Sequence, residues 1–422
     1  MSVARTRLPE VVVTGLGATT PLGGDAPTTW AGIVAARSAA RALTEPWAEA
    51  LPVRIAARAA VEPDTALDRT RARRLDRAAR FALVAAEEAW RDAGFRGPAG
   101  EHGQPPAERV GVVIGSGIGG VGALLRAQEQ LRTGRERAIS PYTVPMVMVN
   151  GAAGAVSLAL NARAAAHSPA GACAAGAEAV AAGLDMIRLG RADVVAVGGG
   201  EAVIGPLTLT AFAAMHAVSR RNDDPAGASR PYDKQRDGFV LGEGAAVLVL
   251  ESAAHARARG ARVYCELAGA GVSADAHHMV RPEPDGLGLA SALRKALADA
   301  GLTPADVAHV SAHATSTPQG DIAESRALNH VLGESGYAVS AVKSAAGHLI
   351  GGSGALGALA AVLSLRDRTV PPVANLADVD DAIALDVVRT VPRALPAGDL
   401  AALSDAAGFG GHNVVLAFRS YS

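Results

Sequence analysis

The chain has 422 residues, of which 49% are hydrophobic and 19% charged, and its formal net charge is -1. This length allows a large core in one or two domains, and the near-neutral charge offers no global basic field for nucleic acid. Two cysteines exclude a disulfide framework, no apolar run reaches membrane-spanning length, and no signal-peptide pattern begins the chain, so we expect a soluble, cytoplasmic protein.

Buried strands that end in glycine turns are expected to alternate with helices along the chain. The strand patterns occupy residues 11–17, 192–197, 263–271 and 414–418. Apolar residues recur at helical spacing over residues 73–90 and 174–189. The alternation predicts an α/β fold with a mainly parallel sheet covered on both sides. Residues 121–150 and 202–230 interrupt this alternation and are predicted to be insertions.

A strand followed by glycines occurs at residues 11–17 and again at 263–271, and a second pair of similar segments lies at 192–200 and 401–411. Such self-similarity is typical of one structural unit that is used twice. We therefore expect two related α/β halves that join near residues 255–262.

A glycine-rich segment at residues 112–120 offers a different class of function. It contains G-x-G-x-x-G after a strand pattern, and Glu136 lies near the distance expected of a ribose-binding acid. This pattern favours an NAD-dependent oxidoreductase as an alternative. The motif lies deep in the chain rather than in an opening βαβ unit, and glycine-rich strand ends without this spacing recur at 15–17 and 198–200.

Cys173 lies among small residues, in the run AGACAAG at 170–176, directly before a predicted helix. The free N–H groups of a helix N-terminus stabilise a thiolate, and small neighbours let a thioester approach. This setting predicts a nucleophile, with a buried structural cysteine as the alternative. Cys265 lies inside a strand pattern and is expected in the core.

Two histidines differ from the others in their setting. His313 ends a strand-like run and is followed by Thr315 and Thr317, while His348 follows Lys343 in a segment of small residues. A cysteine and two histidines, each at the end of an element, favour an acyl-transfer site. We expect no metal site, because no His, Cys or carboxylate cluster has ligand spacing.

Six segments in chain order resemble the β-ketoacyl-acyl carrier protein synthases, most closely their type II elongating branch. They are VVVTGLGATTPLG (11–23), GSGIGG (115–120), SRPYDKQRDGFVLGEG (229–244), HATSTPQGD (313–321), KSAAGHLIGGSG (343–354) and GFGGHN (408–413). The resemblance spans nearly the whole chain. It implies the five-layered α-β-α-β-α thiolase fold, with one half over residues 1–258 and the other over 259–422.

The resemblance also implies a Cys-His-His site for decarboxylative Claisen condensation, hence an acyltransferase that forms carbon–carbon bonds in fatty acid biosynthesis. Cys173 matches the nucleophile, and His313 and His348 match the two histidines. Lys343 matches the lysine that supports them. Two carboxylates, Asp321 and Glu324, match groups that organise the site. No cofactor is implied, because the substrates are carried on the phosphopantetheine of an acyl carrier protein.

Other positions match residues that bind substrate in this family. The backbone N–H groups of Cys173 and Phe409 match the oxyanion hole, and Phe409 also matches a gate residue. Thr315 and Thr317 match hydroxyls that bind the phosphopantetheine arm, Ile118 matches the residue that controls the acyl tunnel, and Ala407 lies at the pocket.

The family implies an acidic carrier protein as partner and usually a homodimer, with a heterodimer that includes a chain-length-factor-like subunit as the alternative. We expect a basic docking face for the carrier protein. The candidates lie on or just before the predicted helix at 73–90: Arg71, Arg73, Arg74 and Arg77. A solvated helix face is the other interpretation of these arginines.

The chain departs from the family pattern near the expected pocket. Ala407 replaces an aromatic residue, Gly357 replaces a glutamate, and the residues at 344–347 are smaller than usual. These departures suggest two alternatives to a housekeeping synthase: a type II polyketide or other specialised ketosynthase, and a paralogue that tolerates an inhibitor. A degradative thiolase would need a second catalytic cysteine, which residues 408–413 lack, and a chain-length factor would lack Cys173.

Overall fold

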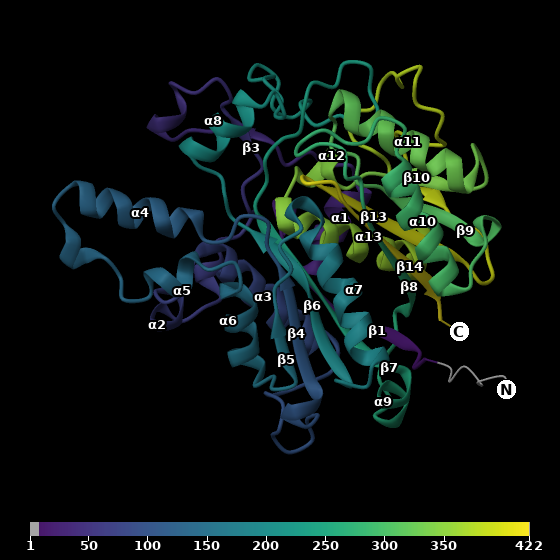
Figure 1. The fold of residues 1–422 in the computed structure, drawn as a ribbon, viewed down its shortest axis with the longest axis horizontal. Helices are drawn as coiled ribbons and strands as arrows, with labels where there is room; N and C mark the ends of the chain where they lie inside the picture. Colours follow the sequence, from purple (N-terminus) through teal and green to yellow (C-terminus); the bar gives the residue numbers. More distant parts are fainter. Residues whose placement is uncertain (1–7, 422) are drawn as a thin grey trace.

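The computed structural model of the protein describes residues 8–421, and within this range ten strands form one sheet in the order β10-β9-β13-β14-β8-β1-β7-β6-β4-β5 (Figure 1). These strands are β1 (Val11–Thr19), β4 (Val110–Gly115), β5 (Ala165–His167), β6 (Val194–Glu201), β7 (Gly244–Ser252), β8 (Cys265–Ala274), β9 (Val307–Ser311), β10 (Ala338–Ser340), β13 (Ala401–Gly408) and β14 (His412–Ser420). Two short ribbons pair β2 (Arg41–Ala42) with β3 (Ile55–Ala56) and β11 (Thr369–Val370) with β12 (Arg393–Ala394).

The α-helices of the described chain connect and cover these strands. They are α1 (Ala26–Val34), α2 (Arg69–Ala72), α3 (Arg77–Asp92), α4 (Val121–Arg132), α5 (Thr143–Val147), α6 (Gly151–Leu160), α7 (Ala175–Arg188), α8 (Pro206–Ala214), α9 (Ala253–Ala258), α10 (Leu287–Ala300), α11 (Pro318–Leu332), α12 (Lys343–Ala346) and α13 (Ser353–Asp367). Across residues 8–421, none of the helices is long and apolar enough to cross a lipid bilayer.

The sheet consists of two units with the same strand order. Outward from the centre, the first unit runs β1-β7-β6-β4-β5 and the second runs β8-β14-β13-β9-β10, so that equivalent strands take equivalent places. Within the sheet, the two units are joined by the pairing of β1 with β8, at Val12 with Glu266 and Val13 with Cys265. One structural unit is therefore used twice, in agreement with the repeat seen in the sequence.

Helices complete a five-layered arrangement, as the expected thiolase fold requires. Helices α7 and α13 contact each other and strands of both units, so they form the middle layer (Figure 1). Helices α3 and α6 cover the outer face of the first unit, and α10, with α11 packed on it, covers the second. The largest core cluster contains residues of α7, α13 and both units, which places the core around the middle helices.

The glycines near the repeated strands do not end them, contrary to the sequence prediction. Gly17 lies inside β1, where an added Cβ would overlap the carbonyl oxygen of Ala85 in α3. Gly271 lies inside β8 and makes the equivalent close approach to Ala292 in α10. The glycine pattern thus repeats because a helix packs directly on the first strand of each unit.

The expectation of a mainly parallel sheet is wrong. Strand β7 is antiparallel to β1 and β6, and β14 is antiparallel to β8 and β13, while the pairs of β4 with β5 and β6, and of β9 with β10 and β13, are parallel. A continuously buried strand carries no signal for its direction, so the sequence pattern could not distinguish the two cases.

Local capping explains where the predicted helices begin. The helix expected at 73–90 is α3, which begins only at Arg77, because the Asp76 side chain accepts from the backbone N–H of Ala78 at 3.0 Å and caps the helix there. The insertion at 121–150 contains α4 and α5, and α4 projects from the body (Figure 1). The insertion at 202–230 contains α8.

Candidate active site

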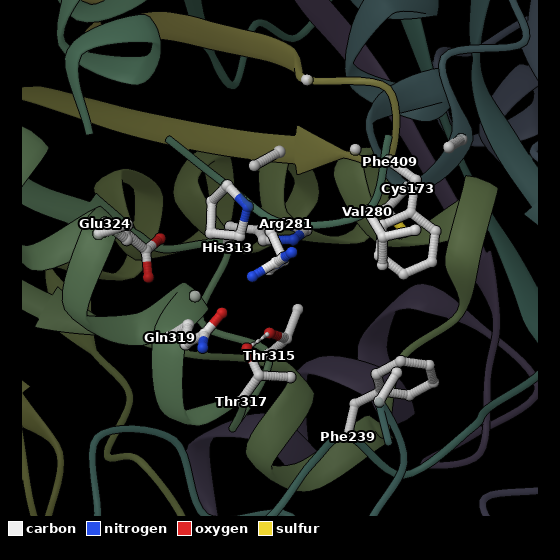
Figure 2. Close-up of a pocket in the computed structure, with 18 of the residues that line it drawn as sticks. Cys173, Phe239, Val280, Arg281, His313, Thr315, Thr317, Gln319, Glu324 and Phe409 are labelled. Atoms are coloured by element: carbon white, nitrogen blue, oxygen red, sulfur yellow. Dashed lines mark hydrogen bonds between the residues drawn. The ribbon is translucent and has the colours of Figure 1, made fainter. Parts of the chain in front are cut away.

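A cavity of about 590 Å³ lies where the two units meet, and both contribute its lining (Figure 2). Cys173 comes from the first unit, directly before α7. His313 follows β9, His348 precedes α13, and Phe409 lies between β13 and β14. The fold therefore brings together four residues that the sequence had singled out in separate motifs.

Cys173 is held on a tight turn at the start of the middle layer. It lies in a 3-10 turn, Ala172–Ala174, that leads into α7, and Ala172 has a positive φ of 50°. The backbone N–H groups of Phe409 and Cys173 face its sulfur. Gly408 brings the Phe409 segment this close, because a Cβ there would overlap the carbonyl oxygen of Gly171. These two N–H groups form a ready oxyanion hole beside the thiol.

Burial raises the pKa of the Cys173 thiol to about 11, while the charge of Lys343 and the N–H groups of Phe409 and Cys173 act in the opposite direction. The position of Cys173 before a helix had predicted a stabilised thiolate, which would have a lowered pKa. Desolvation outweighs that contribution, since the side chain is almost completely buried. The resting nucleophile is therefore a thiol at neutral pH.

Hydrogen bonds assign the same tautomer to both histidines. Nδ1 of His348 accepts from the backbone N–H of Ile350 at 3.2 Å and lies 2.8 Å from Oγ of Ser353. Because Nδ1 accepts from Ile350 and so carries no proton, the Ser353 hydroxyl, which itself accepts from the N–H of Leu349 at 2.8 Å, donates to it. Nδ1 of His313 lies 3.3 Å from Nζ of Lys343, and an ammonium can only donate. Each imidazole therefore carries its proton on Nε2.

The two rings lie together in the cavity, with centroids 5.8 Å apart and planes at 88°. Burial, followed by the nearby charge of Lys343, lowers the pKa of both His313 and His348 well below its usual value. Phe239 covers His348 edge to face, with centroids 5.0 Å apart. Neutral imidazoles with Nε2 protons are hydrogen-bond donors, which suits them to stabilise an oxyanion or enolate.

Charged groups lie behind the histidines. Nζ of Lys343 donates to the carbonyl oxygen of His313 as well as facing its ring. Glu324 accepts from the N–H of Ala314 at 3.0 Å and from the hydroxyl of Tyr232 at 3.0 Å. Burial lowers the pKa of Lys343 and raises that of Glu324 well above its usual range, and each partner opposes the shift of the other.

Asp321 is also buried and fixes the loop that carries His313. It accepts from the N–H groups of Tyr232 at 2.8 Å and Ser316 at 3.1 Å, and Arg236 lies 3.5 Å away. Burial raises its pKa to about 7. The segment 229–244 thus contributes Tyr232 and Arg236 as bracing residues, which the sequence analysis did not single out although it had quoted their motif.

Asp405 is a further residue that sequence reasoning missed. Its buried carboxylate faces the carboxyl of Glu324, the backbone N–H of His313 and the charge of Lys343. Burial raises its pKa. Two carboxyls facing one ammonium imply that one carboxyl retains a proton. A carboxylate inside the buried strand β13, three residues before Gly408, was the available signal.

Gly357 packs closely against β9 and β13. A Cβ there would lie 3.0 Å from Oγ of Ser404 and 3.7 Å from Oγ of Ser311. Both hydroxyls are buried without a hydrogen-bond partner among the described residues. A longer polar side chain at position 357 would reach them, so the departure from glutamate leaves two polar groups unsatisfied rather than simply removing bulk.

The other residues predicted to bind substrate line the same cavity. They are Ile118, Thr315, Thr317, Ala407 and Phe409. The hydroxyls of Thr315 and Thr317 lie 3.0 Å apart (Figure 2). Ile118 is 37% exposed, so an apolar side chain faces the open space next to Cys173.

The glycine-rich segment at 115–120 surrounds a buried carboxylate of the protein. Glu201, at the end of β6, accepts from Oγ of Ser116 at 2.9 Å and from the N–H groups of Gly117 at 2.6 Å and Gly351 at 3.3 Å. Burial raises its pKa to about 7. The N–H groups that a dinucleotide phosphate would need are therefore occupied, which removes the basis of the oxidoreductase alternative.

The predicted docking arginines lie away from this cavity. Arg71 pairs with Glu87 at 2.6 Å, and Arg77 pairs with buried Glu243 at 2.8 Å. Arg73 and Arg74 are exposed. Arg71 and Arg74 line a second cavity, next to α2, α5 and α6. Of these four arginines, Arg73 and Arg74 thus have no carboxylate partner in the described chain, and the guanidinium of Arg74 lies over the ring of Tyr142, 5.3 Å from its centroid.

Sequence comparisons identify relatives over almost the full length. The model of "Beta-ketoacyl synthase, N-terminal domain" matches residues 9–256, and that of "Beta-ketoacyl synthase, C-terminal domain" matches residues 264–377. The chain is 43% identical over 416 residues to the 3-oxoacyl-[acyl-carrier-protein] synthase 2 of Mycobacterium tuberculosis, covering 98% of both chains. It is 41% identical over 415 residues to the protein of that name from Synechocystis, again covering 98% of both chains.

Solved structures agree in fold. A "Beta-ketoacyl synthase from Burkholderia phymatum" matches with a TM-score of 0.89 and 35% identity, covering 98% of this chain and 100% of that one. The "ishigamide ketosynthase/chain length factor" matches with a TM-score of 0.89 and 31% identity, covering 99% and 100%. A chain of the structure "type II PKS acyl-carrier protein in complex with its ketosynthase bound to the hexaketide" also matches with a TM-score of 0.89 and 31% identity, covering 99% of this chain and 100% of that one.

Proposed function

We propose, since this chain belongs to the beta-ketoacyl synthase family, that it condenses an acyl thioester with malonyl-acyl carrier protein to elongate fatty acids. One observation carries this proposal. The Cys173 thiol, the N–H groups of Cys173 and Phe409, and two neutral imidazoles converge on one cavity between the two units. This arrangement suits acyl transfer followed by stabilisation of an enolate.

In the first half-reaction, the sulfur of Cys173 attacks the carbonyl carbon of the acyl thioester. The N–H groups of Cys173 and Phe409 stabilise the tetrahedral oxyanion. The carbon–sulfur bond to the carrier arm breaks, and the arm leaves as a thiol with the proton that Cys173 gives up. Because burial raises the pKa of Cys173 to about 11, the loss of this proton accompanies the attack rather than preceding it.

In the second half-reaction, the bond between the malonyl carboxylate and its α-carbon breaks, and carbon dioxide leaves. The resulting enolate oxygen accepts hydrogen bonds from Nε2 of His313 and His348. The α-carbon attacks the acyl-Cys173 carbonyl, the sulfur leaves as a thiolate, and one proton from solvent restores the thiol. The product is a β-ketoacyl thioester, two carbons longer, on the carrier arm.

Intact-mass spectrometry tests this function. We expect acyl-carrier proteins to add an acyl mass to the wild type and to the Cys265→Ala control, but not to Cys173→Ala. Malonyl-carrier protein should then remove the adduct and yield a β-ketoacyl-carrier protein. An adduct that survives Cys173→Ala, or its absence with every acyl length, would contradict the proposal.

We also propose that the protein acts in the cytoplasm as a dimer that receives substrates from an acyl carrier protein. The insertion at 121–150, part of which projects from the body (Figure 1), supports the dimer, because several of its apolar side chains are 37–70% exposed, among them Leu125, Leu131 and Val144. Sedimentation equilibrium measures the assembly. A monomer at micromolar concentration would contradict this part, whereas a mixed dimer would require a chain-length-factor-like subunit.

A specialised ketosynthase, of polyketide type or tolerant of an inhibitor, is the second candidate. Ala407 favours it, because a small residue replaces an aromatic one on the cavity wall. We expect Ala407→Phe to shift the preferred acyl length and inhibitor affinity, measured as kcat/KM across an acyl series and as inhibitor Kd. If neither changes, the housekeeping role stands alone.

A further inference from the structure

Arg281 is a charged residue of the cavity for which the proposed mechanism has no use. Its side chain lines the cavity, and its guanidinium points inward, seen between His313 and Thr315 in Figure 2. No other lysine or arginine lines the cavity in the described chain. Arg281 is exposed at the open cavity, and when a ligand displaces water there, an anionic group on that ligand would compensate the guanidinium for its lost solvation.

The protein itself does not neutralise Arg281. Within residues 8–421, its guanidinium makes no hydrogen bond or ion pair. The carboxylates that line the cavity have other donors: Asp275 accepts from Nδ2 of Asn413 at 2.6 Å, and Glu283 from the N–H of Leu287 at 2.7 Å. Glu324 is bound to Tyr232 at 3.0 Å. The charge of Arg281 thus remains available to a ligand.

The backbone near Arg281 is hydrogen-bonded to the loop between β13 and β14, which carries Phe409. The N–H of Arg281 donates to Nδ1 of His278 at 3.2 Å, which also accepts from Val280 at 3.0 Å. The N–H of Gly410, next to the gate residue Phe409, donates to the carbonyl oxygen of Met279 at 2.8 Å. These bonds hold the backbone of Arg281 in place beside the loop that carries Phe409.

We propose that Arg281 is an anion-binding residue of the substrate channel and that it pairs with the free carboxylate of the malonyl group. The inference rests on the proposed function, which supplies this substrate. Arg281 lines the same cavity as His313 and Thr315, and the carboxylate is one bond from the reacting carbon. The phosphate of the carrier arm offers the same chemistry, but the length of the pantetheine chain separates it from the thioester.

This pairing predicts an effect on binding rather than on the chemical step. An ion pair made in the ground state must break as carbon dioxide leaves, so it lowers KM without raising kcat. The neutral acyl donor has no carboxylate and gains nothing from Arg281. The first half-reaction should therefore be independent of this residue.

The test uses thioesters of pantetheine, which lack phosphate, and of phosphopantetheine, in acyl and malonyl forms. For Arg281→Met we expect KM for malonyl-pantetheine to rise about ten-fold, as for loss of a charged hydrogen bond, with kcat unchanged or higher. Acylation of Cys173 by acyl-pantetheine should not change. Arg281→Lys should retain most of the affinity, and Arg294→Met, which removes an exposed arginine of α10 outside the cavity, should have no effect.

Each outcome separates the possibilities. If Arg281→Met weakens acyl- and malonyl-phosphopantetheine equally and spares the pantetheine thioesters, the anion is the phosphate and the carboxylate assignment falls. If it weakens none of them, Arg281 is not an anion site. If the wild type forms no acyl adduct at all, the proposed function fails first and this inference falls with it.

Discussion

Two groups of side chains lie at the active site, one facing the cavity and one behind it. The cavity-facing group is Cys173, His313 and His348, and burial keeps all three neutral. The rear group is Lys343, Asp405 and Glu324, of which only Glu324 also reaches the cavity wall, and its members carry charge and a retained proton. The difference shows that the fold supplies hydrogen-bond donors where the reaction occurs and places the charges one layer further back.

The largest expected effect comes from breaking the link between the two groups. Lys343→Met removes the donor to Nδ1 of His313 and the cation beside the two rear carboxyls. We expect kcat to fall about 100-fold, as for a lost oxyanion-hole donor, and the free energy of unfolding to fall by about 3–5 kcal/mol. Steady-state kinetics and urea unfolding measure these changes, with exposed Lys295→Met as the control. Near-normal values would show that the rear group does not act on the cavity-facing one.

The second prediction concerns the charge state of the cavity-facing group. Because the pKa of Cys173 is raised to about 11, alkylation by iodoacetamide should accelerate about ten-fold per pH unit from pH 7 to 10. Peptide mass spectrometry follows this, and Cys265, buried in β8, should stay unlabelled. A plateau near pH 8 would reveal a preformed thiolate. Lys343→Met should slow labelling, because the charge of Lys343 lowers the pKa of Cys173.

The third prediction addresses the proton retained in the rear group. A carboxyl whose pKa is raised in the folded state contributes stability at low pH, and this contribution is lost as pH rises through the folded pKa. Asp405→Asn removes one such carboxyl and adds an amide donor. We expect the free energy of unfolding to rise by about 1–2 kcal/mol at pH 8 and by less at pH 5.5.

Urea unfolding at the two pH values checks this difference, with exposed Asp399→Asn as the matched control. The raised carboxyls at Asp321 and Glu201 remain in both proteins and cancel in the comparison. A gain that does not depend on pH, or a loss at pH 8, would argue against a shared proton between Asp405 and Glu324.

The smallest expected effect lies outside both groups, on the docking face. Arg73→Glu and Arg74→Glu reverse the charge of exposed side chains, so we expect KM for carrier-bound substrates to rise about three- to five-fold at low salt. Pantetheine thioesters should react as before. Arg96→Glu, at another exposed position, is the control. An equal effect on free thioesters would place these arginines in a structural role.

The sequence was sufficient for the residues whose chemistry depends on their own motif. Cys173, His313, His348 and Lys343 could be named because each follows or precedes an element in a recognisable segment, and the fold brings them to one cavity. The duplication was also visible, because helix packing imposes the same glycines on β1 and β8.

What the sequence could not supply depends on burial by distant segments. The pKa of Cys173 rises because both units desolvate it, and Glu201 takes the N–H groups of residues far away in the chain. The protonation state of Asp405 depends on Glu324 and Lys343, which come from other segments of the chain. The directions of β7 and β14 likewise depend on which neighbour each strand pairs with, and no local pattern records that choice.

The division of the active site between two units that share only two residue pairs of sheet has a consequence for synthesis. The ribosome delivers Cys173 first, the histidines later and Phe409 almost last. The nascent first unit therefore exposes a nucleophile that lacks its oxyanion hole, its donors and the helix α13 that covers it. We therefore expect activity only after the second unit has docked and has supplied both histidines and Phe409.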